Sequence, residues 1–161
     1  MRTAVTIAPE SARQPDIITL IRALDDYHLG IYPLESNHML DIETLCGPDV
    51  RFYVARPAPA GGEPLGIGAL WVRPDRSFGE VKRMFVLPAA RGLGVGRQLL
   101  GRIEQEARRE RLPWLRLETG TLSNDALKLY AAGGFRRCGP FADYPDHPMS
   151  VFMEKPLDGP G

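Results

Sequence analysis

The residues best suited to chemistry in this chain lie in one segment, EVKRMFVLPAARGLGVGRQLL, which runs from Glu80 to Leu100. It reads as a short strand, a turn that contains proline, a glycine-rich loop flanked by arginines, and a helix. The pattern Arg91-x-x-Gly94-x-Gly96 can direct backbone N–H groups toward one point, and the N-terminus of the following helix adds partial positive charge. Glycine lets the backbone approach an anion closely. The segment therefore predicts a site for a phosphate or pyrophosphate group.

The spacing separates this loop from two commoner phosphate-binding motifs. No Lys-Ser/Thr pair follows Gly96, so the loop is not a Walker A motif. The glycines at positions 92, 94 and 96 alternate, and no third glycine falls at the spacing of the dinucleotide fingerprint. The R-x-x-G-x-G pattern instead resembles the acyl-CoA pyrophosphate loop of the GCN5-related N-acetyltransferase (GNAT) superfamily.

A second motif supports this resemblance. The stretch NDALKLYAAGGF, from Asn124 to Phe135, is similar to the pattern N-x-A-x-x-x-Y-x-x-x-G-F of the same superfamily. The two motifs stand in the family's order, and the resemblance extends over residues 65–155. It implies the GNAT acyl-CoA N-acyltransferase fold, an α/β (α+β) layout with a mixed, mostly antiparallel sheet and helices on both faces.

Hydrophobic periodicity and turn residues indicate the elements that must position these motifs, in the order β-α-α-β-β-β-α-β-α-β-β. We expect strands at residues 5–7, 51–55, 65–72, 80–86, 114–119, 135–138 and 150–155. We expect helices at residues 16–29, 35–45, 94–111 and 124–132. One domain over residues 1–157 accommodates all of them, followed by a frayed tail at 158–161.

The bulk composition limits the classes of function. The 20 basic and 20 acidic residues cancel, which argues against a nucleic-acid partner held by a strong uniform field. Cys46 and Cys138 show no metal-ligand spacing and are expected to be reduced thiols, and the three histidines show no such spacing either. No apolar run approaches the length needed to span a membrane. The sequence predicts a soluble cytoplasmic protein without a metal.

Transfer of an acyl group from a thioester to an amine makes three demands. The amine must lose its proton, the oxyanion that develops on the carbonyl must be stabilised, and the departing thiolate must be protonated. An alkyl amine has a pKa of about 10 and is mostly protonated at neutral pH, so a base or a chain of waters must take its proton.

Glu80 is the first candidate for that base. It begins the strand that leads into the glycine-rich loop, and a carboxylate at this point resembles the general-base glutamate of histone acetyltransferases in the superfamily. The alternative is a structural ion pair between Glu80 and Lys82 or an arginine of a neighbouring strand. Glu118, on another expected strand, is the second candidate carboxylate.

Tyr130 is the candidate acid. It occupies the position in the second motif that, by the resemblance, protonates the thiolate of coenzyme A. A phenol with a pKa of about 10 is suited to that transfer. The alternative is a core tyrosine that packs against Ala126 one helical turn away.

Backbone groups of the strand and loop are expected to hold the cofactor. The pantetheine arm carries two amides and can add to an exposed strand edge as a peptide does, with Pro88 ending the strand pairing. The resemblance implies that acetyl-CoA contacts Met84, Val86, Arg91, Gly92, Leu93, Gly94, Val95, Gly96, Arg97 and Asn124. Two alternatives stay open, because Arg97 suits a solvated helix position and Asn124 suits a helix N-cap.

One segment of the chain, residues 23–50, is rich in acidic residues. Residues 23–50 contain no Lys or Arg but carry Asp25, Asp26, Glu35, Asp41, Glu43 and Asp49. In the superfamily this helix–loop–helix borders the acceptor pocket, so the resemblance implies a cationic amine such as a polyamine or a lysine side chain. A solvated helical face is the alternative explanation for these charges.

Together these features predict an N-acetyltransferase that moves an acetyl group from acetyl-CoA to a primary amine of a small molecule or peptide by direct attack on the thioester. Two alternatives remain. One is a non-catalytic acyl-CoA-binding sensor or scaffold, and the other is a protein that uses the loop for ATP or a dinucleotide. A homodimer is compatible with the resemblance, since dimers are frequent among related proteins.

Overall fold

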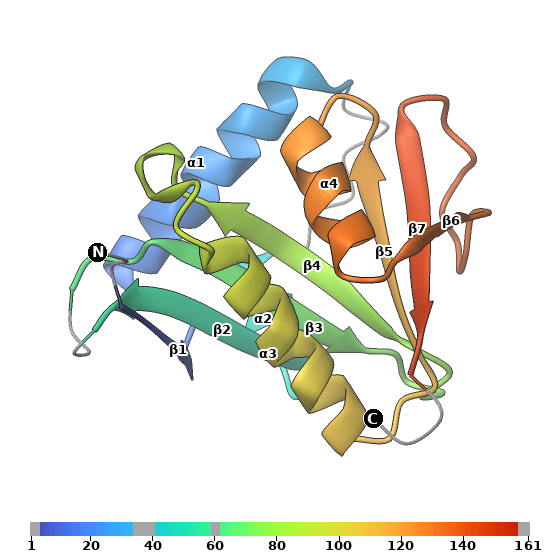
Figure 1. Cartoon of the computed structure of the whole chain (residues 1–161), viewed down its shortest axis with the longest axis horizontal. Helices are drawn as coiled ribbons and strands as arrows, with labels where there is room; N and C mark the ends of the chain where they lie inside the picture. Colours follow the sequence, from blue (N-terminus) through green and yellow to red (C-terminus); the bar gives the residue numbers. More distant parts are fainter. Residues whose placement is uncertain (1–3, 34–40, 59–61, 158–161) are drawn as a thin grey trace.

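The computed structural model describes residues 4–33, 41–58 and 62–157. Within these ranges the strands are β1 (Val5–Pro9), β2 (Val50–Pro57), β3 (Gly66–Val72), β4 (Gly79–Val86), β5 (Trp114–Gly120), β6 (Arg136–Cys138) and β7 (Ser150–Pro156). The helices are α1 (Pro15–Ile31), α2 (Ile42–Leu45), α3 (Val95–Arg109) and α4 (Asn124–Ala132), with a short 3-10 turn, η2 (Pro88–Ala90). The strands form one sheet in the order β1-β2-β3-β4-β5-β7-β6 (Figure 1).

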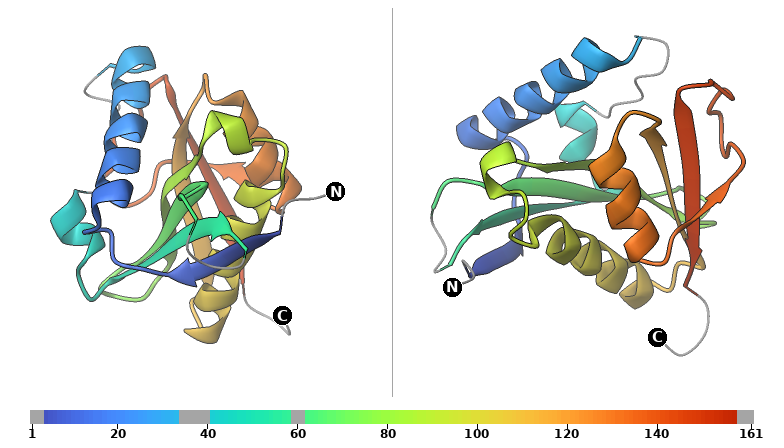
Figure 2. Two further views of the ribbon diagram at one scale, coloured as in Figure 1. Left: turned by 90° about the vertical axis from the view of Figure 1, so that its left-hand side faces the viewer. Right: turned by 45° about the horizontal axis from the view of Figure 1, so that its top comes forward.

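Helices cover both faces of this sheet (Figure 2). One core packs α1 and α2 against one face, and the other packs α3 and α4 against the opposite face. Strand β2 contributes to both cores, because successive side chains of a strand point to opposite faces. Phe52 and Val54 belong to the α1 side, whereas Tyr53 and Ala55 belong to the α3 side.

The sheet opens between β4 and β5. Every other neighbouring pair of strands is antiparallel, but β4 and β5 are parallel, and their register covers only Gly79 opposite Leu115 and Glu80 opposite Arg116. Beyond this pair the two strands diverge (Figure 1). The divergence leaves the later part of β4 with a strand edge that β5 does not pair.

A β-bulge accompanies this divergence. Ile67 of β3 pairs with Phe85 of β4, but Ala69 pairs with Lys82, so the β4 side has one residue more than the β3 side. Arg83 lies in this bulge with φ of 57°, in the left-handed region that non-glycine residues seldom adopt. A bulge bends its strand and increases the local twist, which favours the separation of β4 from β5.

The turn from β4 into α3 depends on its glycines. Gly92 and Gly94 have φ of 84° and 80°, and Gly94 is the N-cap of α3 in the left-handed conformation. Helix α3 then places Val95, Leu99 and Ile103 in the core, each no more than 1% exposed. These residues, four apart in the sequence, form one buried stripe along the helix.

The predicted α/β class and order of elements are confirmed, with local differences. The second helix, expected at residues 35–45, is observed only as Ile42–Leu45, and the expected residues 35–40 lie outside the described part of the chain. Asp41 is its N-cap, since the Asp41 carboxylate accepts a hydrogen bond from the Thr44 N–H at 2.8 Å. The third helix ends at Arg109 rather than Arg111, because Arg111 adopts a positive φ of 59°.

Candidate active site

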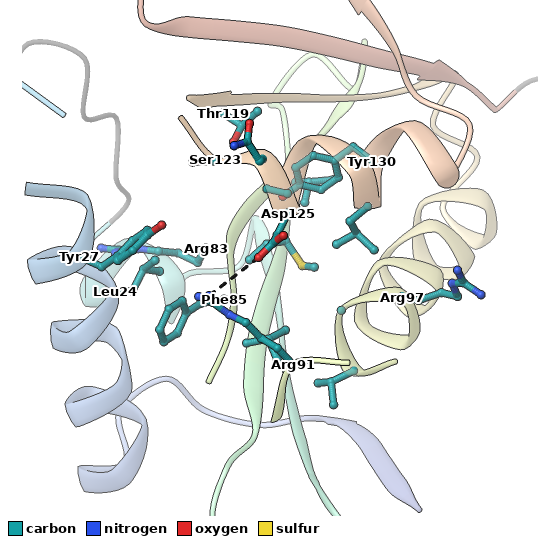
Figure 3. Close-up of a pocket in the computed structure, with 18 of the residues that line it drawn as sticks. Leu24, Tyr27, Arg83, Phe85, Arg91, Arg97, Thr119, Ser123, Asp125 and Tyr130 are labelled. Atoms are coloured by element: carbon teal, nitrogen blue, oxygen red, sulfur yellow. Dashed lines mark ion pairs between the residues drawn. The ribbon is translucent and has the colours of Figure 1, made fainter. Parts of the chain in front are cut away.

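A cavity of about 1240 Å³ occupies the space between the diverging strands. Its walls come from α1, the later part of β4, the loop before α3, the end of β5 and the start of α4 (Figure 3). Every residue that the sequence assigned to the cofactor lines this cavity, and so do Tyr130 and Glu118. Glu80 is absent from the lining, as far as the described residues define it.

One end of the cavity is the glycine-rich loop. The helical ladder of α3 begins where the Gln98 N–H donates to the Gly94 carbonyl at 3.1 Å, so the N–H groups of Val95, Gly96 and Arg97 lie ahead of it. Such N–H groups, with the helix dipole, form an anion site. Arg97 points away from the cavity (Figure 3), which leaves the backbone as its contribution to that site.

Arg91 faces the start of α4 across the cavity. Its guanidinium lies 3.9 Å from the Asp125 carboxylate (Figure 3), and both side chains are well exposed. An exposed pair at this distance contributes little to stability. Arg91 is therefore available to meet an anion at the loop.

The middle of the cavity is bounded by the unpaired edge of β4. Met84, Phe85 and Val86 line it beyond the last residues that β5 pairs. Backbone N–H and C=O groups along such an edge can bind an extended chain that carries amides. Gly96 lets α4 approach on the opposite side, since a Cβ there would lie 3.2 Å from the Leu129 side chain.

Tyr130 reaches the cavity from α4 and is only 5% exposed. Its ring packs edge-to-face on Phe135, with centroids 5.9 Å apart. Burial raises the pKa of the Tyr130 phenol above its usual value, and the nearby Glu118 charge adds to the effect. The raised pKa favours the protonated form of the Tyr130 phenol.

Glu118 enters the cavity from β5. Burial raises the pKa of this carboxyl to about 7, with the Ser150 hydroxyl and the Lys82 charge acting in the opposite direction. A carboxyl that titrates near neutrality is present in both forms in the physiological range, as a general base should be. Glu118 is thus a carboxyl of the cavity lining with a pKa near neutrality.

Glu80 has a different environment. It is fully buried, and its carboxylate forms ion pairs with Arg73 and with Lys82, whose Nζ lies 2.9 Å away. Tyr144, from the loop between β6 and β7, donates a hydrogen bond to the same carboxylate. This arrangement favours the structural ion pair that the sequence offered as the alternative for Glu80.

We expect a Glu80→Gln variant to lose about 3–5 kcal/mol of unfolding free energy, because Arg73 and Lys82 would keep their buried charges without the carboxylate. Urea denaturation followed by circular dichroism measures the loss. Glu43→Gln is the control, since Glu43 forms its ion pair with Arg13 at the surface and should change stability little. A stable Glu80→Gln protein that has lost activity would instead assign Glu80 to catalysis.

Tyr32 closes one side of the cavity in a way that no sequence motif indicated. Its hydroxyl accepts a hydrogen bond from the Leu122 N–H at 2.9 Å and shares one with Ser123 Oγ at 2.8 Å. The contact requires glycine at position 120, because a Cβ there would lie 2.0 Å from the Tyr32 ring. Tyr32 therefore ties the end of α1 to the loop that precedes α4.

The described acidic residues of 23–50 do not line the main cavity. Asp25 pairs with Arg83, Glu43 pairs with Arg13, and Asp41 caps α2. Among the described residues, none of these carboxylates lines the main cavity, and Glu35 lies outside them. The part of α1 that does line it is aromatic and apolar, with Leu24, Tyr27, His28 and, just beyond the helix, Tyr32.

Two further findings concern the described residues as a whole. They contain no group of three or more His, Cys, Asp or Glu side chains arranged to hold a metal ion. None of the helices observed in these ranges combines the length and the apolar character that crossing a membrane requires.

Known proteins give consistent matches to this chain. The model of the Acetyltransferase (GNAT) family matches residues 17–135. An IAA acetyltransferase of Azospirillum brasilense is 50% identical over 153 residues, covering 95% of this chain and 98% of that protein. YsnE of Bacillus subtilis (strain 168), an uncharacterised N-acetyltransferase, is 42% identical over 127 residues, covering 78% of this chain and 82% of its own length. The solved structure of a candidate acyl-CoA N-acyltransferase from Klebsiella pneumoniae has a TM-score of 0.78 and 35% identity, covering 96% of this chain and 98% of that one.

Proposed function

Since this chain belongs to the acetyltransferase (GNAT) family, we propose that it transfers an acetyl group from acetyl-CoA to a primary amine of a small molecule or peptide by direct attack on the thioester. The chain is an acyltransferase, and its family implies acyl-CoA as the co-substrate. The observation that supports the proposal is that one cavity joins a glycine-rich loop at a helix N-terminus, an unpaired strand edge, and the side chains of Glu118 and Tyr130.

The shape and donors of the cavity fit acetyl-CoA. The N–H groups at the start of α3 and the Arg91 side chain suit a pyrophosphate, and the edge at Met84–Val86 suits the amides of a pantetheine arm. Backbone N–H groups of that edge also suit an oxyanion. When bound, acetyl-CoA supplies the acetyl thioester and leaves as the thiol.

Glu118 is the base in this proposal, in place of Glu80. It lines the cavity, whereas Glu80 is enclosed by Arg73, Lys82 and Tyr144. With a pKa of about 7, the Glu118 carboxylate takes the proton that the amine loses as the C–N bond forms.

Tyr130 is the acid, and its acidity depends on Glu118. Burial raises the pKa of Tyr130, and the ionised Glu118 raises it further. Once Glu118 has taken the proton of the amine, this contribution disappears and the phenol becomes a stronger acid. Tyr130 is therefore best able to give its proton to the sulfur at the stage when the C–S bond breaks.

Thiol release from acetyl-CoA tests the activity against a panel of small amines, amino acids, polyamines and lysine-containing peptides. Release that depends on an acceptor supports the proposal. Binding of coenzyme A without release across the panel would favour the non-catalytic sensor or scaffold instead. ATP that competes with coenzyme A for binding would favour a general nucleotide-phosphate site.

A Gly94→Ala variant tests the loop. We expect the KM for acetyl-CoA to rise about fivefold to tenfold, because a side chain strains the left-handed backbone that sets the start of α3. Steady-state kinetics with varied acetyl-CoA measure the change. Gly101→Ala is the matched control, since Gly101 lies inside α3 with open space around its Cβ position. An unchanged KM in the Gly94 variant would contradict the assignment of the loop to the cofactor.

A further inference from the structure

The α1 side of the cavity carries a row of aromatic rings. Tyr27, His28 and Tyr32 all line the cavity, from the end of α1 and the residue that follows it. The ring centroids of Tyr27 and His28 lie 5.7 Å apart in an edge-to-face contact, and those of His28 and Tyr32 lie 5.9 Å apart at an angle of 54°. Figure 3 shows Tyr27 and Leu24 on this side of the cavity. The three rings therefore form one continuous wall.

The middle ring of this row, His28, favours its neutral form. Burial lowers the pKa of the His28 imidazole, and the Arg83 charge lowers it further, while Asp25 acts in the opposite direction. A lowered pKa disfavours the proton that would make the ring a cation. The row therefore presents a neutral aromatic surface, against which another ring can pack edge-to-face.

Part of this wall is exposed although it is apolar. In the described part of the chain, four large hydrophobic side chains are exposed, and Tyr27, Leu93 and Leu122 among them line the cavity. Tyr27 is 44% exposed and Leu122 is 54% exposed. Leu122 lies beside the row of rings, because its N–H donates to the Tyr32 hydroxyl at 2.9 Å. Exposed apolar side chains that gather at one cavity are typical of a surface that a ligand covers.

The row of rings lies close to Glu118. Gly120 follows Glu118 by two residues in the regular register of β5, so the two positions face the same side of the sheet. A Cβ at Gly120 would lie 2.0 Å from the Tyr32 ring, so this ring occupies that side of the strand. Two residues of a strand span about 7 Å. A ligand whose ring packs on the row can therefore present a group on a short chain to Glu118.

The carboxylates of the lining suit a ligand with one amine at this place. Among the described residues that line the cavity, two carry a carboxylate, Glu118 and Asp125. Asp125 lies at the end of the cavity that holds the glycine-rich loop, where its carboxylate is 3.9 Å from the Arg91 guanidinium. Beside the rings, Glu118 is therefore the carboxylate of the described lining that can pair with an ammonium group. A polyamine would bring further ammonium groups without a carboxylate of this lining to meet them.

We propose that the amine acceptor is an arylalkylamine, whose aromatic ring packs on Tyr27, His28 and Tyr32 while its amine reaches Glu118. This inference rests on the proposed function, in which Glu118 is the base. The transfer itself is unchanged. The neutral amine forms the C–N bond and gives a proton to Glu118, the C–S bond breaks, and the sulfur takes the proton of Tyr130.

Binding of matched amines tests the inference without relying on turnover. Calorimetric titrations of the protein loaded with coenzyme A compare phenethylamine and tryptamine with cyclohexylethylamine, which has a saturated ring on the same short chain, and with spermidine. We expect at least one aromatic amine to bind about threefold or more tightly than cyclohexylethylamine, as contacts between aromatic rings require, and about tenfold more tightly than spermidine. Aromatic amines that do not bind, or that bind no more tightly than cyclohexylethylamine or spermidine, would overturn the inference.

Two substitutions of Tyr27 separate recognition by a ring from simple apolar burial. Tyr27 is the most exposed of the three rings, so replacing it should leave the fold intact. Tyr27→Leu should bring the ratio of aromatic to cyclohexyl binding to within about twofold of one, because it keeps an apolar surface but removes the ring. Tyr27→Phe keeps the ring and should keep the ratio at about threefold or more. An unchanged ratio in the leucine variant, or an equal loss in both variants, would overturn the inference.

Leu29→Ala is the matched control. Leu29 is another exposed apolar residue of α1, at 50% exposed, but it lies outside the cavity lining. Its variant should keep the ratio within about twofold of the wild type. Turnover of the same amines distinguishes the two proposals. Selective binding of aromatic amines without acetyl transfer to any acceptor would remove the proposed function alone, whereas transfer that favours cyclohexylethylamine or spermidine would remove the arylalkylamine alone.

Discussion

A Tyr130→Phe variant is expected to lose about 10²-fold in kcat while its KM for acetyl-CoA changes little, because a proton donor typically contributes that much to the reaction step alone. The phenyl ring keeps the contact of Tyr130 with Phe135, so packing is preserved. Steady-state kinetics with a saturating acceptor, together with a titration of coenzyme A, separate the two parameters.

Tyr53→Phe is the control for this substitution. Tyr53 is also buried, at 3% exposed, but it packs in the core under α3 with Arg102 over its ring and lies outside the cavity lining. Its variant should keep kcat within about twofold of the wild type. If Tyr130→Phe were as active as the wild type, Tyr130 would be a core residue without a catalytic role. The strongest argument for an enzyme over a non-catalytic acyl-CoA binder would then be lost.

The sequence was most informative where local signals determine the structure. The helix predicted at residues 124–132 has these bounds in the structure, and the Gly133–Gly134 pair ends it, with Gly134 at a φ of 94°. Its N-cap is Ser123, so the N-cap role offered as the alternative for Asn124 is wrong. The glycine-rich turn before α3 was also predicted from local residue types, since Gly92 and Gly94 adopt the positive φ that glycine permits. In both segments the local preference and the tertiary structure agree.

The choice between Glu80 and Glu118 could not be made from local signals. It depends on where β4 and β5 part, and this point is fixed by the whole sheet. Glu80 lies in the last pair that joins the two strands, opposite Arg116, and is fully buried there. Glu118 lies two residues beyond Arg116 along β5, past the point of divergence, and so lines the cavity.

Contacts between residues far apart in the sequence could not be predicted from local signals either. The bond from the Leu122 N–H to the Tyr32 hydroxyl joins residues 90 positions apart. Gly120 directly follows the strand expected at residues 114–119, and nothing local to it indicates that the Tyr32 ring occupies the space of its missing side chain. Likewise, Arg83 gave no local sign that its backbone would form a bulge, since arginine has no preference for positive φ.

A Glu118→Gln variant is expected to lose about 10²-fold in kcat/KM, because an amide cannot take the proton of the amine. The pH dependence gives the sharper test. The base must be ionised, so the wild-type rate should rise with pH through about 7 and then level off, as the pKa of Glu118 predicts. The variant should lose this inflection and keep only the rise that comes from deprotonation of the acceptor amine itself.

The pH dependence of the unfolding free energy tests the raised pKa of Glu118 in a second way. The pKa of Glu118 is raised in the folded protein, so folding favours its protonated form, and the wild type loses stability as the pH rises from the unfolded pKa toward about 7. Glutamine has no charge to bury. The variant should therefore gain stability relative to the wild type at about pH 8 and show a smaller gain at about pH 5, as urea denaturation at the two pH values would reveal.

The combination of the two results is what identifies a catalytic base. Replacing a carboxyl that serves only the structure would lower the free energy of unfolding, as we expect for Glu80. Replacing a dispensable carboxyl would change neither the activity nor the stability. Loss of activity together with a gain in stability above neutral pH indicates a group whose burial costs the fold free energy and serves the reaction. If a Glu118→Gln variant kept the wild-type rate and pH profile, Glu118 would not be the base. The proton of the amine would then be taken by a chain of waters or by Glu80.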